Sequence, residues 1–331
     1  MKNKKIIILT ISVIGLLIVL LIIVIFLRVE INSSRLNSNG TSNYIDTTAD
    51  AGDDEYITNE DVDIPNKDKD ADIMPLFDAH SHLVPDFQEG FLYNLLESTE
   101  LTGMAILGVE DSLYLQEEYS GEFIAFAFIG KIDENGIEDL RSQIISGAKG
   151  IGELSIRHPA TINSKEKKYE ADSSNLMKIY SIAADYNIPI NIHFDYSLSY
   201  INELENAISQ NPNTIFIWAH MGDAQYDAVE TLMDQYDNLY ADISSRNPYY
   251  ERAYDLSDQR LDDIGVIKSE WKELFEKHPD KFFFGLDLGP ADRHKNAEET
   301  IDYYRSILSQ LNSDAEAKIS YKNAHRLFGI K

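Results

Sequence analysis

LFDAHSH (Leu76 to His82) is a short apolar run that ends in two histidines. Later runs carry a His or an Asp at or beside their ends: IPINIHF (Ile188 to Phe194), TIFIWAH (Thr214 to His220) and FFFGLD (Phe282 to Asp287). A further run, GIGELSI (Gly150 to Ile156), has Glu153 in a comparable place. Side chains at the C-terminal ends of parallel strands meet at one mouth when the strands close into a barrel. Nitrogen and oxygen ligands gathered there would suit a divalent transition metal.

Short apolar runs alternate with amphipathic segments from Met74 onward, which favours parallel strands joined by helices. Strands are predicted at Leu76–His80, Met104–Val109, Ile124–Ile129, Ile151–Leu154, Ile190–His193, Ile215–His220, Leu239–Ile243 and Phe282–Leu286. Helices are predicted at Gly136–Ala148, Ser174–Tyr186, Ile201–Gln210, Ala224–Tyr236, Ile267–His278, Ala297–Leu311 and Ala315–Tyr321. Eight such units predict an α/β fold, the (β/α)8 TIM barrel. The polar stretch from Arg246 to Ile264 is predicted to be a loop over the barrel mouth.

Composition excludes several classes of protein. The 331 residues carry a formal net charge of -27, which disfavours nucleic acid as a partner because like charges repel. The chain has no cysteine, so disulfides, thiolate metal sites and lipid attachment through cysteine are excluded.

The N-terminal residues predict a membrane anchor. Residues 6–27 are almost entirely Ile, Leu, Val and Phe, and at 1.5 Å per residue such a helix spans a bilayer core of about 30 Å. Residues 1–5 contain three lysines, which predicts a cytoplasmic N-terminus and a single-pass cell-membrane protein with its large domain outside the cell. A cleaved signal peptide is the alternative, although no small-residue cleavage site follows.

Residues 28–73 form a polar, acidic segment with few apolar side chains. Such a segment cannot bury enough surface to offset the entropy of ordering, so we predict a disordered linker. A calcium-binding loop is the alternative, but the Gly and Glu spacing of an EF-hand is absent. The folded domain is predicted to span residues 74–331.

The histidines are the first candidate metal ligands. His80 and His82 lie two residues apart on a predicted strand, so both imidazoles can face one ion. His193 and His220 each end a later strand. Taken singly, either could instead be a buried structural histidine or one that caps a helix.

Two acidic residues complete the predicted ligand set. Asp287 follows three Phe and a Gly, where an unpaired carboxylate would be costly to bury, and a metal or a salt bridge would compensate it. We expect Asp287 to bind the ion and to take a proton from the attacking water. Glu153 could bridge two ions, or it could be a structural residue paired with Lys149 or Arg157. Asp78 is expected to support the ligands.

Four motifs carry a resemblance to a known family: FDAHSHL (77–83), NLYADIS (238–244), FFFGLDLGP (282–290) and NAHRLFGI (323–330). From about Met74 to Ile330 the chain resembles the amidohydrolase superfamily, and within it the amidohydrolase-related (amidohydrolase 2) branch. The resemblance implies a (β/α)8 barrel with one or two divalent ions, usually zinc. It implies metal positions at His80, His82, His193 and Asp287. His220 would bind a second ion or polarise the substrate.

The sequence departs from that branch at two positions. Glu153 stands near a place where Lys is common and is more like TatD-type and phosphotriesterase-like relatives. Leu286 precedes the aspartate, where the branch usually has Ser. The departure at Glu153 leaves the number of ions open between one and two.

We therefore expect a metal-dependent hydrolase that cleaves a C–N, C–O or lactone bond of a small molecule, with Asp287 and His220 as catalytic residues. Arg157, Arg246 and Arg293 each follow a strand end and could bind an anionic substrate, or form salt bridges within loops. The alternatives are a metal-dependent non-oxidative decarboxylase, a TatD-like phosphodiesterase and a surface binding module without catalysis.

Overall fold

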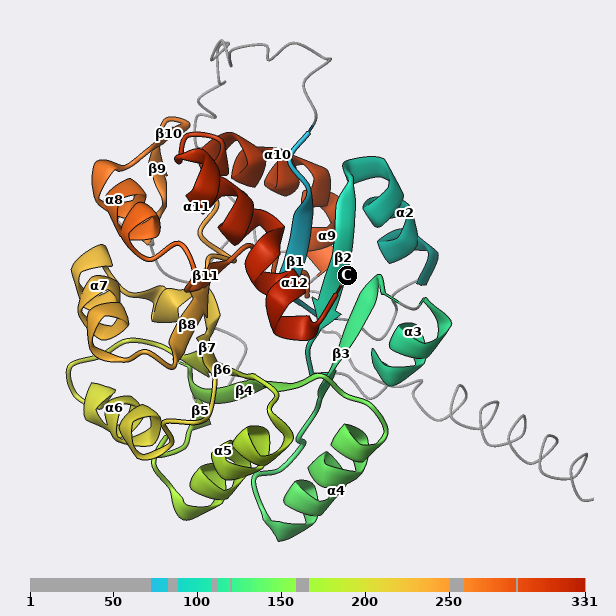
Figure 1. The fold of residues 1–331 in the computed structure, drawn as a ribbon, viewed down its shortest axis with the longest axis vertical. Coiled ribbons are helices and arrows are strands. Elements are labelled where there is room, and N and C mark those ends of the chain that lie inside the picture. Colours follow the sequence, from blue (N-terminus) through green and yellow to red (C-terminus); the bar gives the residue numbers. More distant parts are fainter. Residues whose placement is uncertain are drawn as a thin grey trace, which may run out of the picture. The chain divides into compact units, whose positions relative to one another are not determined.

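Eight parallel strands form the wall of a barrel, in the order β1-β2-β3-β4-β6-β7-β8-β11 (Figure 1). Their bounds are β1 (Leu76–Ser81), β2 (Leu101–Ile106), β3 (Phe123–Ala127), β4 (Gly150–His158), β6 (Ile190–Phe194), β7 (Phe216–Trp218), β8 (Leu239–Asp242) and β11 (Phe282–Phe283). The last strand meets the first, because Ala79 N donates to Phe284 O (2.9 Å). This nearly closed parallel barrel confirms the predicted TIM-barrel fold.

The structure is a computed structural model that describes residues 73–82, 89–108, 112–119, 121–158, 167–250, 259–289 and 291–330. The predicted membrane anchor (6–27) and nearly all of the predicted linker (28–73) lie outside these residues. Within the described ranges, no helix combines the length and the apolar character needed to cross a bilayer.

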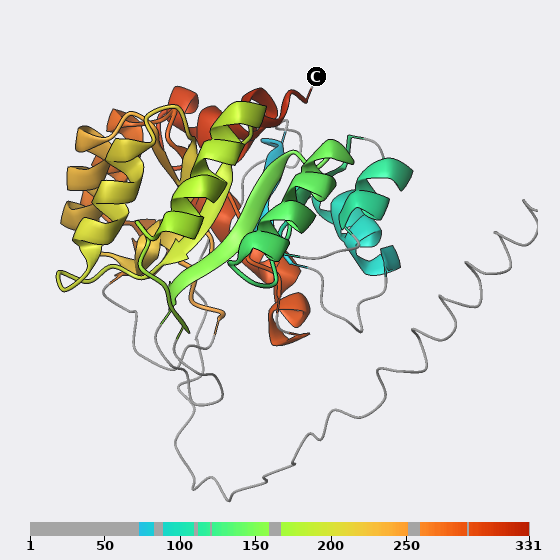
Figure 2. The same cartoon turned by 90° about the horizontal axis from the view of Figure 1, so that it is seen from below.

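Helices surround the strands, as Figures 1 and 2 show. Their bounds are α2 (Glu89–Thr99), α3 (Ser112–Glu118), α4 (Glu134–Ile145), α5 (Ser174–Tyr186), α6 (Ile201–Gln210), α7 (Tyr226–Gln235), α8 (Ser269–Lys277), α9 (Ala291–Lys295), α10 (Ala297–Leu308), α11 (Ser313–Ala317) and α12 (Asn323–Phe328). The bounds predicted for α5 and α6 match residue for residue. A π-helical turn, η3 (Lys318–Lys322), joins α11 to α12. Outside the barrel path, β5 (Lys167–Lys168) pairs with β4, and β9 (Asp262–Asp263) pairs with β10 (Val266–Ile267), both antiparallel.

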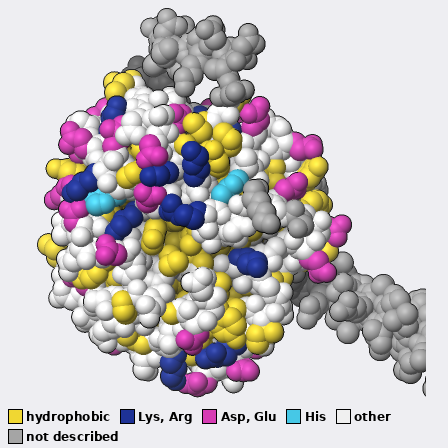
Figure 3. Space-filling view, viewed as in Figure 1, with side chains coloured by type: hydrophobic (Ala, Val, Ile, Leu, Met, Phe, Trp, Pro, Cys, Tyr) yellow, Lys and Arg dark blue, Asp and Glu magenta, His cyan; other side chains and the backbone are white. Residues whose placement is uncertain are grey.

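Apolar packing closes one end of the barrel. Phe77 of β1 and Phe283 of β11 form a buried cluster with Phe126 and with Phe328 of α12. The ring of Phe328 lies 5.8 Å from that of Phe77 and 5.7 Å from that of Phe126. Figure 3 shows the α12 face, on which acidic and basic side chains are interspersed. Because the barrel strands are parallel, the polar residues that follow their C-terminal ends gather at the other end of the barrel.

The chain leaves β7 through a left-handed turn, η1 (Ala219–Asp223). The φ angles of His220, Met221 and Gly222 are 55°, 53° and 60°. A Cβ at residue 222 would lie 1.9 Å from the Trp218 ring, so the turn requires glycine there. The predicted strand Ile215–His220 is therefore too long: β7 ends at Trp218, and His220 is carried by the turn.

The last barrel strand is also shorter than predicted. Phe282–Leu286 was expected as one strand, but β11 ends at Phe283. The chain beyond it stays against β1, where Asp287 N donates to His80 O (2.5 Å). Asp287 has a φ of 54°, and this left-handed conformation turns the chain away from strand geometry.

Candidate metal centre

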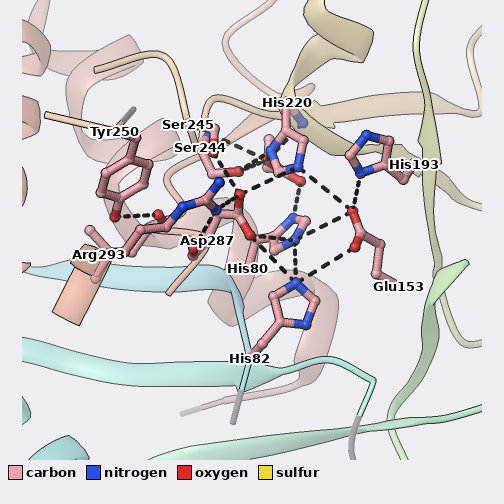
Figure 4. Close-up of polar contacts among 12 residues, drawn as sticks. His80, His82, Glu153, His193, His220, Ser244, Ser245, Tyr250, Asp287 and Arg293 are labelled. Atoms are coloured by element: carbon pink, nitrogen blue, oxygen red, sulfur yellow. Dashed lines mark hydrogen bonds and ion pairs between the residues drawn. The ribbon is translucent and has the colours of Figure 1, made fainter. Parts of the chain in front are cut away.

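Six predicted side chains come together at one end of the barrel (Figure 4). They are His80 and His82 from β1 and its end, Glu153 from β4, His193 from β6, His220 from the turn after β7, and Asp287 after β11. The structure therefore places every predicted metal ligand in one cluster.

One group of ligands has the spacing of a single coordination sphere. His80 Nε2 lies 3.2 Å from His82 Nε2, 3.7 Å from Glu153 Oε1 and 3.7 Å from Asp287 Oδ1. His82 Nε2 lies 3.6 Å from Glu153 Oε2 and 3.5 Å from Asp287 Oδ1. Ligands about 2.1 Å from a tetrahedral ion are about 3.4 Å apart. The ligand atoms of His80, His82 and Glu153 lie close enough together to hold one divalent cation, at what we call the first ion position, and Asp287 Oδ1 lies beside both histidines.

Hydrogen bonds on the far side of each ring orient the first two histidines. His80 Nδ1 contacts Asp242 Oδ2 at 2.9 Å, and His82 Nδ1 donates to Leu107 O at 2.8 Å. A proton on Nδ1 leaves the Nε2 lone pair facing the cation position. Histidine ligands of metals are oriented in this way by carboxylate or carbonyl acceptors.

Ser244 orients His220 by a similar route. The Ser244 hydroxyl donates to Asp242 and lies 2.7 Å from His220 Nδ1. Because its one proton is used on Asp242, the hydroxyl accepts from His220 Nδ1. His220 Nε2 then carries a lone pair, 3.6 Å from both Glu153 Oε1 and Asp287 Oδ2.

A second ligand group overlaps the first. Glu153, His193 and His220 have ligand atoms close enough to hold an ion, and His193 Nδ1 lies 2.8 Å from Glu153 Oε1. We call this the second ion position. Glu153 belongs to both groups, which is the geometry of a carboxylate that bridges two ions.

The charge of the cluster also suits a cation. Burial opposes charging of His80, but the neighbouring carboxylates, Asp242 foremost, raise its pKa to about 9. Burial likewise opposes ionisation of Asp287, yet Arg293 and the imidazoles hold the pKa of that carboxyl well below its usual range. The carboxylates of the site are therefore ionised and favour a positive charge beside them. Since Asp242 holds Nδ1 of His80, a positive charge is attracted to Nε2, the atom that would bind a metal.

Comparison with known proteins identifies the family. The family model described as amidohydrolase matches residues 112–330, about two thirds of the chain. The chain belongs to the amidohydrolase family. The matched region contains Glu153, His193, His220 and Asp287, whereas His80 and His82 precede it. Membership makes the protein an enzyme of a metal-dependent superfamily and confirms the predicted amidohydrolase 2 branch. No curated protein matches the chain.

Solved structures share the fold of this amidohydrolase. An uncharacterised TIM-barrel protein from Bordetella bronchiseptica has a TM-score of 0.58 at 12% identity, over 77% of this chain and 99% of its own. A probable 2-pyrone-4,6-dicarboxylic acid hydrolase from Acinetobacter baumannii, with citric acid bound, has a TM-score of 0.52 at 13% identity, over 77% and 99%. A dihydroxybenzoic acid decarboxylase from Polaromonas, with manganese and an inhibitor, has a TM-score of 0.52 at 13% identity, over 77% and 97%.

The polar segment after β8 also supplies residues to the amidohydrolase site. Ser245 Oγ donates to Asp287 Oδ2 at 2.6 Å, and Tyr250 OH donates to Leu286 O at 2.7 Å. Both follow β8 in the segment ADISSRNPYY (241–250). Ser245 was not predicted; the signal for it is the dense run of polar residues directly after an apolar strand.

The three predicted substrate arginines have different surroundings. Arg293 lies in the site, where it contacts the Asp287 carboxylate and stacks 4.7 Å over the Tyr250 ring. Arg157 pairs with Glu203 and stacks on Tyr200 at 4.4 Å, as the alternative of a loop salt bridge anticipated. Arg157 is thus not the partner of Glu153, which faces histidines instead.

Arg246 does not have the position expected of a substrate ligand. The side chain is 1% exposed, and its guanidinium donates to the carbonyls of His220, Met221, Ala224 and Gln259. Its role is to hold the turn that carries His220. The loop predicted over the mouth, Arg246 to Ile264, thus begins with a buried anchor, and residues 251–258 lie outside the described ranges.

Asp78 supports the site as predicted, and it does so by joining the two ends of the barrel sheet. Its carboxylate accepts from His80 N (3.0 Å), Leu286 N (2.9 Å) and Ser81 Oγ (2.5 Å). Burial raises its pKa to about 7 despite these donors. The segments that carry His80 and Asp287 are therefore held together by one buried side chain.

Proposed function

We propose that this amidohydrolase hydrolyses a C–N, C–O or lactone bond of a small anionic molecule. The observation that carries the proposal is the spacing of His80, His82 and Glu153, whose ligand atoms could hold one divalent ion, with Asp287 Oδ1 beside both histidines. We further propose that the ion is Zn²⁺, because a mixed His and carboxylate set of four is a preferred zinc environment. The overlapping group with His193 supports a second ion.

The proposed chemistry divides between the ion and the protein. A bound cation supplies Lewis acidity, which activates water and polarises the substrate carbonyl. Asp287 Oδ2 is the proton acceptor, and it returns the proton to the leaving group. His220 would contribute through the cation that its Nε2 lone pair helps to hold, because that cation would stabilise the developing negative charge on the substrate oxygen.

Arg293 supports an anionic substrate. Its guanidinium is held against Asp287 Oδ2, the atom that must accept a proton. A substrate carboxylate offers Arg293 an alternative partner and frees that oxygen. Binding of an anion and release of the base would then occur together.

The test combines metal analysis with a substrate screen. Residues 74–331 loaded with Zn²⁺ are expected to hydrolyse members of an ester, lactone and amide panel that carry a carboxylate, and to lose activity when the metal is removed. Neutral analogues of the same compounds are the control. A wild-type protein that retains no ion and turns over no compound would refute the proposal.

A decarboxylase is the second candidate, because Arg293 beside the ion position could equally hold the carboxylate that leaves. The same screen with aromatic and enol acids, read out as carbon dioxide, distinguishes the two reactions. Carbon dioxide release without hydrolysis would favour the decarboxylase.

We propose that the enzyme is anchored in the cell membrane with its barrel outside. The apolar run at 6–27 and the lysines before it support this arrangement. Protease added to intact cells should release the barrel into the medium. Full protection, with cleavage only after lysis, would contradict the proposed orientation.

A further inference from the structure

A carboxylate outside the predicted ligand set contacts two histidines at once. Asp195 directly follows β6, and its Oδ1 lies 3.0 Å from His193 Nε2. Its Oδ2 lies 3.2 Å from Nδ1 of His158, the last residue of β4. The two imidazole rings are 4.3 Å apart in an edge-to-face arrangement. Asp195 therefore offers one oxygen to each ring.

The main chain defines where Asp195 lies. Asp195 N donates to Arg157 O at 3.0 Å, which continues the pairing of β6 with β4. The residue is 7% exposed. Its carboxylate is thus placed by the barrel sheet and not by a mobile surface contact.

This placement decides which nitrogen of His193 is available. An ionised carboxylate only accepts hydrogen bonds, so both rings donate to Asp195. With its proton on Nε2, His193 presents the lone pair of Nδ1, the atom 2.8 Å from Glu153 Oε1 at the second ion position. The histidine ligands of the first position do not depend on Asp195, since Asp242 and Leu107 O orient His80 and His82.

We propose that Asp195, held in place by His158, is a positioning residue that presents His193 to the second ion and so sets the affinity of that ion alone. The inference rests on the proposed metal-dependent function. The carboxylate of Asp195 would thus affect the affinity of the second ion position and not that of the first.

The experiment measures ion affinity directly. The probe is Zn²⁺ alone, titrated into metal-free protein in competition with a chromophoric chelator. Asp195→Ala is expected to weaken the second ion 10- to 100-fold, the usual effect of losing a partner of a metal-bound histidine, with the first ion within about twofold of wild type. Asp195→Asn should recover part of the loss, because the amide oxygen still accepts from Nε2. Co²⁺ spectra should change only for the second equivalent.

Two further variants separate positioning from charge. Glu203→Gln removes a nearby carboxylate that pairs with Arg157. It should bind both ions like wild type. His158→Ala leaves Asp195 intact but removes its second donor, and a loss of several-fold in the second ion is expected.

Four outcomes would overturn the inference. Two concern the Asp195→Ala variant: unchanged affinity for both zinc ions, or an equal loss of affinity for both. The other two are a wild-type protein that binds only one zinc ion per chain, and a third bound zinc ion that is lost in Asp195→Ala. Should Asp195→Ala fail to fold, Asp195→Asn decides by the same criteria. A wild-type protein that binds no zinc would refute the proposed function as well, whereas the other outcomes leave that function standing.

Discussion

Three residues of the site adopt left-handed backbone conformations. The φ angles of His220, Ser245 and Asp287 are 55°, 60° and 54°. Such conformations cost about 1–3 kcal/mol each for residues other than glycine and persist only where the surroundings enforce them. Here the surroundings include Arg246, whose guanidinium binds the carbonyl of His220, and Asp78, which binds the amide of Leu286. Each left-handed residue redirects the chain after a strand and aims a side chain at the cluster.

At this scale, Asp287→Asn tests the acid–base and ligand roles together. The amide has nearly the same shape but is neutral, so we expect activity to fall about 10²- to 10⁴-fold and the first ion to bind more weakly. Activity and zinc content per chain are the measurements. Asp263→Asn, at a side chain 81% exposed, is the control. Undiminished activity in Asp287→Asn would remove this residue from the mechanism.

At the scale of elements, turns after the strands carry the chemistry, and the strands themselves provide the frame. The turn η1 follows β7 and is wedged between the Trp218 ring and the Arg246 guanidinium. Trp218 is held in turn by its Nε1, which donates to Phe194 O at 2.7 Å, beside His193. Packing of this turn therefore sets the positions of two candidate ligands, His220 in the turn and His193 on the adjacent strand β6.

Gly222→Ala should disrupt this turn. The added methyl group would lie 1.9 Å from the Trp218 ring, so we expect a loss of about 3 kcal/mol in the free energy of unfolding and weaker binding of the second ion. Gly265→Ala is the matched control, since residue 265 has a φ of 78° but open space around its Cβ position. It should cost only about 1 kcal/mol, the effect of backbone strain. Equal losses in the two variants would show that the ring contact is unimportant.

At the scale of the whole molecule, the barrel brings anionic oxygens together that would repel one another without a cation. Glu153 comes from β4 and Asp242 from β8. Asp287 lies in the segment after β11, and Asp195 directly follows β6. Each contacts at least one imidazole. Bound ions would relieve this accumulation of charge, and ion binding should therefore stabilise the fold.

Removal of metal should thus lower the melting temperature. An ion present at a thousandfold excess over its Kd contributes about 4 kcal/mol, which for a domain of this size shifts the melting temperature by on the order of 10 °C. Scanning calorimetry with chelator and after zinc is restored measures the shift. Lower pH should remove the same stabilisation, because ligand imidazoles bind protons and release the ion. An identical melting temperature with and without chelator would contradict the site.

The sequence by itself determined the barrel, the family resemblance and the six candidate ligands, because these depend on local patterns. Apolar runs define strands, and His80, His82 and Asp287 stand at fixed places relative to them. The limit at Trp218 was misplaced because the left-handed turn after it arises from packing and not from propensity. The limit at Phe283 was misplaced because the next amide, Phe284 N, donates to Ile319 O of η3.

Only the tertiary structure decided what surrounds those ligands. It buried Arg246 under the turn, placed Arg293 against Asp287, and joined Asp195 to both His158 and His193. These contacts connect segments far apart in the chain or depend on which way a side chain turns. Hydrogen bonds of this kind have a fixed direction and a reach of about 3 Å, so the pattern of residue types along the chain does not specify them.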